Sequence, residues 1–366
     1  MTMATGLLAG FGANFSVVSS EPGLLDAWID FNRDGDFLDA GEKIASNVVV
    51  VAGTNLVSTN VPATATAGAS YARFRVSTAG NLGPVGPADD GEVEDYRVNI
   101  LKPASGTTQV IDDPQNPGRG LLVVYGTSRT DVITLTAIPG IARLGLPGRV
   151  QVLNQTSFQT FTDTAFNRVL INAFEGSDVV LLDPRLNKSS YIHGGTGDDV
   201  LYGSEGADEI HGGAGRDTIL ARGGADLVFG EDGNDFLYGD GGDDIVSGGL
   251  GTDYLYGGSG RDVLNGGQGL DTLFGLDGDD ILMGGNWTYD NDAAALLAIR
   301  GIWSGAGTFT DRIAGLATRL NATKVTDDGS KDAIWGSTGR DWFIDFANRD
   351  QFYDLLALGS AADKKN

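Results

Sequence analysis

Ten aspartates recur at intervals of nine residues in the second half of the chain. A glycine stands two residues before each of them, and an aliphatic residue stands two residues after. Carboxylates that lie side by side repel one another, and a hard divalent cation bound between them removes that repulsion. The spacing therefore predicts cation binding, and the predicted ligands are Asp199, Asp208, Asp217, Asp226, Asp235, Asp244, Asp253, Asp262, Asp271 and Asp280.

Written as nine-residue units, the pattern runs without a gap from Gly194 to Met283. Units such as GGTGDDVLY and GGAGRDTIL hold glycine at position four, aspartate at position six and an aliphatic residue at position eight. This matches the calcium-binding repeat G-G-x-G-x-D-x-U-x. The segment resembles the RTX (haemolysin-type calcium-binding) repeat family. That resemblance implies a parallel β-roll, an RTX solenoid, that binds several Ca²⁺ ions.

The residues explain why such a fold suits the sequence. Each unit supplies a turn and a short strand, and two units complete one coil. The middle side chain of the strand points opposite to its neighbours, so position eight faces a thin core between two sheets. Glycine allows the positive φ and close backbone packing of the turns. Counted from Gly194, odd-numbered units stack their aspartates in one column and even-numbered units in a second column.

Calcium suits these columns because it accepts six to eight oxygens in flexible geometry, backbone carbonyls included. Each column of five aspartates leaves four gaps, which predicts about eight calcium sites in this block. The unit ARGGADLVF departs from the pattern, because Ala221 and Arg222 stand where glycines are expected. Arg222 lies on the side of the even column. We predict that it replaces an ion beside Asp226 and that less calcium binds there.

The pattern weakens before the roll proper, which we place at 194–285. Residues 120–193 keep the aspartate-and-strand core at Asp131 and Asp178 but lose the full glycine frame. We interpret them as degenerate, metal-poor β rungs that cover the start of the roll, because a solenoid otherwise exposes its core and an unpaired edge.

The pattern also changes after the roll. In residues 286–326 the apolar side chains recur at intervals of three and four residues, which predicts a small helical insertion. The nine-residue frame returns in 327–366, with Asp332 and Asp341 at position six. This segment is predicted to form the final coil and a C-terminal cap.

Residues 1–101 follow a different pattern, of short strands separated by turn residues, which predicts an antiparallel β-sandwich. The hexamer GEVEDY at Gly91–Tyr96, together with DAWIDFNRDGD upstream, resembles the GEVED domain of bacterial surface and secreted proteins. Residues 102–119 are predicted to link this domain to the roll. The whole chain is thus expected to be mainly β.

One loop of the sandwich has the D-x-N-x-D-G spacing of an EF-hand-like calcium loop, although the glutamate comes at the thirteenth position and no helix clearly flanks it. Its predicted ligands are Asp30, Asn32, Asp34, Asp36 and either Asp39 or Glu42. The alternative is a polar hairpin with solvated acids.

Two further acids share one face of a neighbouring strand. Glu92 and Glu94 either complete this loop site or form salt bridges with Arg73 or Arg75. The sequence leaves the two options open.

The outer faces of the roll are also patterned. Position nine of the odd units forms an aromatic ladder that includes Tyr238, Tyr256 and Phe274, and position seven of the even units is apolar. Apolar stripes of this length rarely stay bare. Either the helices or the sandwich cover them, or they form a docking or glycan-stacking face. Cover over only one sheet would support the second option.

Composition limits the function further. The 366 residues include 49 acidic and 25 basic side chains, for a formal net charge of −24. Nucleic acid and anionic membranes reward positive charge, so we expect neither as a partner. No apolar run approaches the roughly 18 residues of a membrane span. The chain has no cysteine, which excludes thiol catalysis.

We do not expect an enzyme. The two histidines, His193 and His211, stand beside glycine turns, and the sequence contains neither an H-E-x-x-H zinc motif nor a G-x-S-x-G elbow. The prediction is a non-catalytic calcium-binding module of a secreted or cell-surface bacterial protein, which folds on Ca²⁺ and serves adhesion, matrix or scaffold roles. A cell-surface protein or glycan is the expected partner. The alternatives are an RTX-type secreted hydrolase and a carbohydrate-binding module that uses the aromatic ladder.

Overall fold

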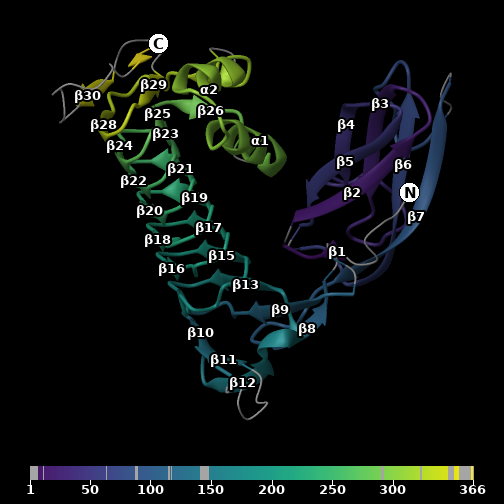
Figure 1. Ribbon diagram of the computed structural model, residues 1–366. Coiled ribbons are helices and arrows are strands. Elements are labelled where there is room, and N and C mark those ends of the chain that lie inside the picture. The colour runs from purple at the N-terminus through teal and green to yellow at the C-terminus, as the bar shows by residue number, and fades with distance from the viewer. Residues whose placement is uncertain are drawn as a thin grey trace. The chain divides into compact units, whose positions relative to one another are not determined.

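The computed structural model describes residues 7–10, 12–62, 64–86, 90–113, 116, 118–140, 148–289, 292–321, 324–344, 350–353 and 364–365. The chain divides into two compact units, residues 1–104 with 112–119 and residues 105–111 with 120–366. Strands dominate both units (Figure 1).

The N-terminal unit is a sandwich of two sheets. Its five-stranded sheet has the order β1-β7-β6-β3-β4, and β2 pairs with β5 in the second sheet. One apolar core takes side chains from both sheets, among them Phe15, Val57 and Phe74. All pairs are antiparallel except β1 with β7, which confirms the predicted sandwich. The strands are β1 (Leu7–Leu8), β2 (Gly12–Ser19), β3 (Gly23–Ile29), β4 (Lys43–Val50), β5 (Gly53–Asn60), β6 (Gly68–Ser77) and β7 (Glu92–Leu101).

The second unit begins with less regular strands. Strand β8 lies beside β9 in one sheet of the roll, so part of the segment 102–119, predicted as a linker, is strand. At the end of the other sheet, β10, β11 and β12 form an antiparallel meander. A short 3-10 helix at Asp163–Ala165 precedes β13. The strands are β8 (Thr108–Asp112), β9 (Gly120–Tyr125), β10 (Val132–Ile138), β11 (Arg149–Asn154), β12 (Ser157–Thr162), β13 (Arg168–Glu175) and β14 (Val179–Leu182).

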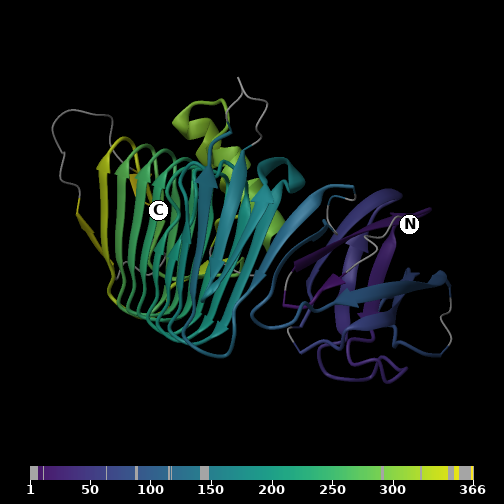
Figure 2. The ribbon, with the colours of Figure 1, turned by 90° about the horizontal axis from the view of Figure 1, so that it is seen from below.

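From β13 onward the chain winds as a parallel β-roll, seen as two rows of aligned arrows in Figure 2. The odd sheet has the order β12-β11-β10-β14-β16-β18-β20-β22-β24-β28-β30, and the even sheet has the order β31-β29-β25-β23-β21-β19-β17-β15-β13-β9-β8. The predicted parallel roll is therefore confirmed. Its repeat strands are β15 (Ser190–Thr196), β16 (Val200–Tyr202), β17 (Glu209–Ala214), β18 (Thr218–Leu220), β19 (Leu227–Gly233), β20 (Phe236–Gly241), β21 (Ile245–Gly251), β22 (Tyr254–Ser259), β23 (Val263–Gln268), β24 (Thr272–Asp277) and β25 (Ile281–Met283).

The core of the roll is the column of position-eight side chains. All ten are fully buried and belong to one apolar cluster that runs along the roll. Strand pairing sets each of them beside the residue one coil away, as in the pairs Leu201 with Ile219 and Ile210 with Val228. The predicted inward direction of position eight is thus confirmed.

Position four requires glycine for two reasons. At Gly251 the backbone φ is +141°, and a Cβ would lie 1.4 Å from the carbonyl oxygen of Gly233, one coil away. At Gly278 the φ is +149°, and the corresponding distance to the Gly260 oxygen is 1.5 Å. Side chains rarely adopt such φ values, and no side chain fits so close to a backbone oxygen. The glycines therefore set how closely the turns stack.

The predicted helical insertion is confirmed. It comprises β26 (Asn286–Trp287), α1 (Ala293–Trp303), α2 (Phe309–Leu316) and β27 (Val325–Thr326). The Asp292 side chain caps α1 by accepting from the Ala295 amide, and Thr308 with Asp311 forms a capping box on α2. Both helices share an apolar core with the outer face of the even sheet.

The roll resumes after the insertion. Strand β28 (Ala333–Thr338) pairs with β24, and β29 (Trp342–Ile344) pairs with β25, which confirms that the nine-residue frame returns. Strands β30 (Gln351–Tyr353) and β31 (Lys364–Lys365) follow. Residues 345–349 and 354–363 of the predicted cap lie outside the described residues.

Candidate metal centres

The ten predicted aspartate ligands form two columns. In each column, the carboxylate Oδ1 accepts a hydrogen bond from the backbone N–H of the aspartate one coil earlier. The odd column shows distances of 2.8–2.9 Å from Asp199 to Asp271, and the even column shows 2.7–2.9 Å from Asp208 to Asp280. The structure thus brings all ten together as the nine-residue spacing predicts.

The second oxygen, Oδ2, has no hydrogen-bond partner in nine of these ten side chains, although all ten are 0–3 % exposed. The exception is Asp208, whose Oδ2 accepts from the backbone N–H of Ser204 at 2.7 Å. A buried charged oxygen without a partner is costly. Burial accordingly raises the carboxyl pKa from its ordinary 3.8 in every case, and well above it in Asp262 and Asp280. The pKa reaches about 6 in Asp208, Asp217 and Asp253, about 7 in Asp199 and Asp244, and about 8 in Asp226, Asp235 and Asp271.

In nine of the ten units, Oδ2 lies against the glycine at position one. A Cβ on Gly212 would lie 2.4 Å from Asp217 Oδ2 and 2.9 Å from the carbonyl oxygen of Gly230 in the next coil. A Cβ on Gly230 would lie 2.4 Å from Asp235 Oδ2 and 2.5 Å from the Gly248 oxygen. Glycine therefore lets a carboxylate oxygen and a carbonyl oxygen border the same backbone position, where a methyl group would clash with both.

These residues fit a calcium ion. Both bordering groups are hard oxygen acceptors, which Ca²⁺ prefers, and an ion would satisfy the oxygens that lack donors. The aspartates at position six, with turn carbonyls such as those of Gly230 and Gly248, would hold it. When bound, the cation supplies the positive charge that the stacked carboxylates lack.

The columns extend beyond the ten units. Asp178 and Asp332 continue the odd column with unpartnered Oδ2 atoms, and Asp341 accepts from the Asp280 amide in the even column. Asp131 differs, because its oxygens accept from Thr127 and Gln155. The first rung thus satisfies its carboxylate through hydrogen bonds within the protein. Whether residues 120–193 bind little metal stays a prediction, because Asp178 in the same segment has an unpartnered oxygen.

Arg222 does lie on the side of the even column but does not contact the Asp226 carboxylate. Its Nη1 donates to the carbonyl oxygens of Gly203, at 2.7 Å, and of Leu182, and its guanidinium lies over the ring of Tyr202. Arg222 therefore donates to carbonyl oxygens about one and two coils earlier. Whether less calcium binds beside Asp226 stays a prediction.

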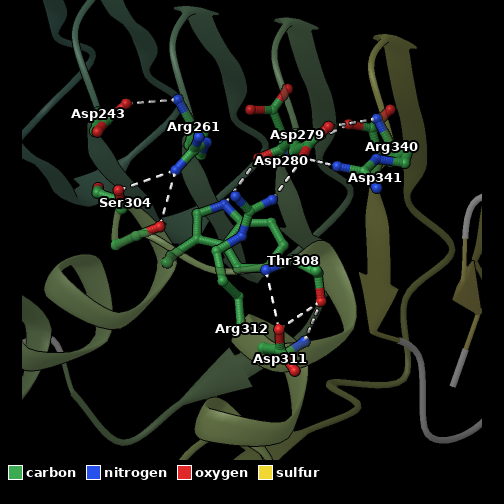
Figure 3. Close-up of polar contacts among 12 residues, drawn as sticks. Asp243, Arg261, Asp279, Asp280, Ser304, Thr308, Asp311, Arg312, Arg340 and Asp341 are labelled. Carbon is green, nitrogen blue, oxygen red and sulfur yellow. Dashed lines mark hydrogen bonds and ion pairs between the residues drawn. The ribbon is translucent and has the colours of Figure 1, made fainter.

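The helical insertion and the final coil make contacts at the even column that the sequence did not identify. Arg312 and Arg340 both pair with Asp279, at 2.5 and 2.9 Å, and Arg261 donates to the carbonyl of Ser304 at 2.9 Å (Figure 3). The spacing of apolar residues predicts the helices but gives no signal for these contacts, because they depend on how the insertion folds back.

The acidic loop of the sandwich holds two of its predicted ligands in a structural role. Asp30 and Glu42 are 4 % and 2 % exposed. Asp30 Oδ2 accepts from the Gly35 amide at 3.2 Å, and Glu42 Oε1 accepts from the Phe31 amide at 3.1 Å. These bonds close the loop on itself.

Three other predicted ligands of this loop are exposed and lie together. Asp34, Asp36 and Asp39 each offer an oxygen within 4.8 Å of the others. The Asn32 amide group donates to Asp34 at 3.1 Å and to Asp39 at 2.6 Å. The loop can therefore present three carboxylates to a cation. Whether calcium binds there stays a prediction.

Glu92 and Glu94 do not form the salt bridges considered for them. Arg73 pairs with Asp95 through two hydrogen bonds of 2.6 Å, and Arg75 donates to backbone carbonyls, including that of Gly83 at 2.6 Å. Glu94 accepts instead from the Tyr96 hydroxyl. Arg73 pairs with Asp95 because that residue offers it both oxygens of one carboxylate. The other option, that Glu92 and Glu94 complete the loop site, stays a prediction.

The two outer faces of the roll differ. On the even sheet, Leu227, Ile245, Val263 and Ile281 are 0–5 % exposed and pack against the insertion. On the odd sheet, the aromatic ladder stays partly open to solvent. Cover over one sheet only is the arrangement expected for a docking face.

Family comparisons agree with this geometry. A sequence profile for the RTX calcium-binding nonapeptide repeat matches residues 189–219, 220–255 and 256–286, and a profile for the GEVED domain matches residues 24–99. The chain contains an RTX calcium-binding repeat array and a GEVED domain. The RTX match spans both aspartate columns, and the GEVED match spans the acidic loop and most of the sandwich. No curated protein and no solved structure matches the chain. No helix among the described residues is long and apolar enough to cross a membrane.

Proposed function

We propose that this RTX module is a non-catalytic, calcium-folded part of a secreted or cell-surface bacterial protein, with an adhesion, matrix or scaffold role. The observation that supports it is the run of buried aspartate oxygens without hydrogen-bond donors. Extracellular calcium modules have Kd values of about 10⁻⁴ to 10⁻³ M. Such sites fill outside a cell and stay empty where free calcium is low, so the roll would fold after export.

The experiment is far-UV circular dichroism and small-angle scattering of the full chain at micromolar and at 10 mM free calcium, with magnesium as the control ion. Strand signal and compaction should appear with calcium and not with magnesium, because magnesium demands rigid octahedral geometry and gives up its water reluctantly. A roll that keeps its strand signal in excess chelator at neutral pH would refute the proposal. For location, protease treatment of intact producing cells should remove the protein.

The proposal that the module is non-catalytic is supported by the contacts of His211, a candidate acid–base group. His211 stacks between Tyr191 and Phe229, with ring centroids at 5.2 and 4.6 Å, and its nitrogens contact Glu209 and Glu231. An imidazole held in this way packs the sheet. A panel of ester, peptide and glycoside substrates should show no calcium-dependent turnover, and turnover of any of them would favour the hydrolase alternative.

Of the binding roles, a protein partner is favoured over a glycan. In the ladder, Tyr238, Tyr256, Phe274 and Trp335 stack ring on ring, with centroids 4.7–4.9 Å apart and interplanar angles of 5–15°. Each ring face is covered by the next ring, so the edges face solvent, whereas a sugar packs its C–H groups on an open face. A glycan array should therefore show no binding that Tyr256→Ala abolishes, and such binding would restore the carbohydrate alternative.

A further inference from the structure

The helical insertion donates hydrogen bonds to backbone carbonyls in the turns of the even column. Arg300 of α1 donates from Nη1 to the carbonyl oxygens of Ala225, at 2.5 Å, and Asp226, at 3.3 Å. Trp303, at the end of the same helix, donates from Nε1 to the carbonyl of Asp279 at 2.8 Å. Ala225 and Asp279 both stand at position five, directly before an aspartate of the column.

The odd column has no counterpart to these contacts. Within the described part of the chain, no side chain donates to a position-five carbonyl of its five repeat turns, from Asp198 to Leu270. Arg216 is the arginine at position five there, and its guanidinium lies over the ring of Phe236. The two columns therefore share one repeat but differ in what their turn carbonyls bind.

Arg300 also places a positive charge where the even column would otherwise need one. Its guanidinium is attracted by the carboxylates of Asp244, Asp226 and Asp243. It is half-buried, so water screens this attraction less than it would at an exposed site. A calcium ion in the gap between Asp226 and Asp244 would be repelled by the Arg300 guanidinium. Two nearby carbonyl oxygens, those of Ala225 and Asp226, already accept hydrogen bonds from Arg300.

The same turn departs from the repeat in a second way. At position one, nine of the ten units have glycine and one has Ala221, which is fully buried. In the other units a Cβ at this position would fall within 2.6 Å of the aspartate Oδ2. Ala221 therefore puts a methyl group beside the Asp226 carboxylate, where the other units have only a glycine hydrogen.

We propose that Arg300 takes the place of a calcium ion between Asp226 and Asp244, so that the helical insertion makes the middle of the even column less dependent on calcium than the odd column. This inference rests on the proposed calcium-dependent folding. The odd column then carries most of the calcium response. The insertion joins the roll only when the coils that present Ala225 and Asp279 have formed, so its docking follows the folding of the roll.

The first test compares Arg300→Gln with Arg216→Gln, which removes the same charge from the odd side. The readouts are the calcium midpoint of the strand signal and the number of ions bound per chain at saturation, measured by metal analysis after gel filtration. Arg300→Gln should raise the midpoint about threefold or more, because the even gap then lacks a cation. In the Ala221→Gly background, which removes the methyl group beside Asp226, the same substitution should also bind about one additional ion. Arg216→Gln should change neither. Equal midpoints and equal ion counts in wild type and Arg300→Gln would overturn the inference.

The second test needs no variant and decides the matter if Arg300→Gln does not fold. Hydrogen exchange of the wild-type chain is followed while calcium is lowered with a chelator. The Asp226 amide, which donates to Asp244, should stay protected at calcium levels that release the Asp217 and Asp235 amides. Simultaneous release in both columns would refute the inference while leaving calcium-dependent folding intact. Protection of every amide in full chelator would instead refute the proposed function.

Discussion

Replacing Asp235 by asparagine should change the stability of the roll in opposite directions with and without calcium. Asp235 Oδ1 accepts from the Asp217 amide at 2.8 Å, and its Oδ2 is buried without a donor. Asparagine keeps an oxygen for the amide and presents an NH₂ group to the neighbouring carbonyl. The substitution therefore removes a cation ligand and also removes a buried negative charge.

The magnitudes follow from the two roles. With 10 mM calcium and a Kd of about 10⁻⁴ M, one ion contributes about 2.7 kcal/mol, which the variant loses. Without calcium, burial raises the Asp235 pKa from 3.8 to about 8, which corresponds to a cost of about 5 kcal/mol at pH 7.5. Relaxation and water penetration reduce that cost to about 1–3 kcal/mol. The variant gains this amount in the calcium-free state.

The assay is urea unfolding of wild type and Asp235→Asn at pH 7.5, in 10 mM calcium and in chelator. Asp232→Asn is the matched control, because Asp232 lies in the same turn but is exposed. The control should shift the unfolding free energy by less than about 0.5 kcal/mol in either buffer. If Asp235→Asn has the same sign of effect in both buffers, the buried oxygen does not hold a cation.

Three further outcomes are expected. Gly251→Ala should prevent folding of the roll even in calcium, with a loss above about 3 kcal/mol, because its Cβ would lie 1.4 Å from the Gly233 oxygen; Gly301→Ala, at an open helical position, should instead gain up to about 1 kcal/mol by thermal unfolding. Without calcium, the strand signal should be stronger at pH 5 than at pH 8. The folded-state pKa values of Asp226 and Asp271 are about 8 against 3.8 unfolded, so the folded state binds more protons and its stability falls as pH rises through that window; a signal unchanged or stronger at pH 8 would contradict this. Leu255→Ala should cost about 2–5 kcal/mol and raise the calcium midpoint, because Leu255 is fully buried in the core of the roll; an unchanged midpoint would count against coupling between core and ions.

Most of the roll could be predicted from the sequence because each fixed position of the nine-residue repeat corresponds to one kind of contact in the structure. Glycine at position four allows the turns to approach closely, aspartate at position six forms the stacked carboxylates, and the aliphatic residue at position eight fills the core. The helical insertion was also predictable, since the apolar spacing in α1 and α2 and the returning frame at Asp332 and Asp341 are local signals. These features depend on neighbours one coil away, which the period itself identifies.

Contacts between distant segments could not be predicted in this way. The contact of Arg300 with the turn at Ala225 joins residues 75 positions apart in the chain, and nothing in the spacing of either segment indicates it. The ion pair of Arg73 with Asp95 depends on the register of β6 and β7, in which these residues lie opposite each other, and composition does not determine that register. The contact of Arg222 with the Gly203 carbonyl likewise depends on the path of one turn.

Anomalous scattering from crystals grown in calcium would locate the ions themselves. Calcium peaks are expected beside the Oδ2 atoms along the odd column, from Asp199 to Asp271. Peaks absent from these positions, with the same oxygens bonded to water or to a lysine, would contradict this expectation.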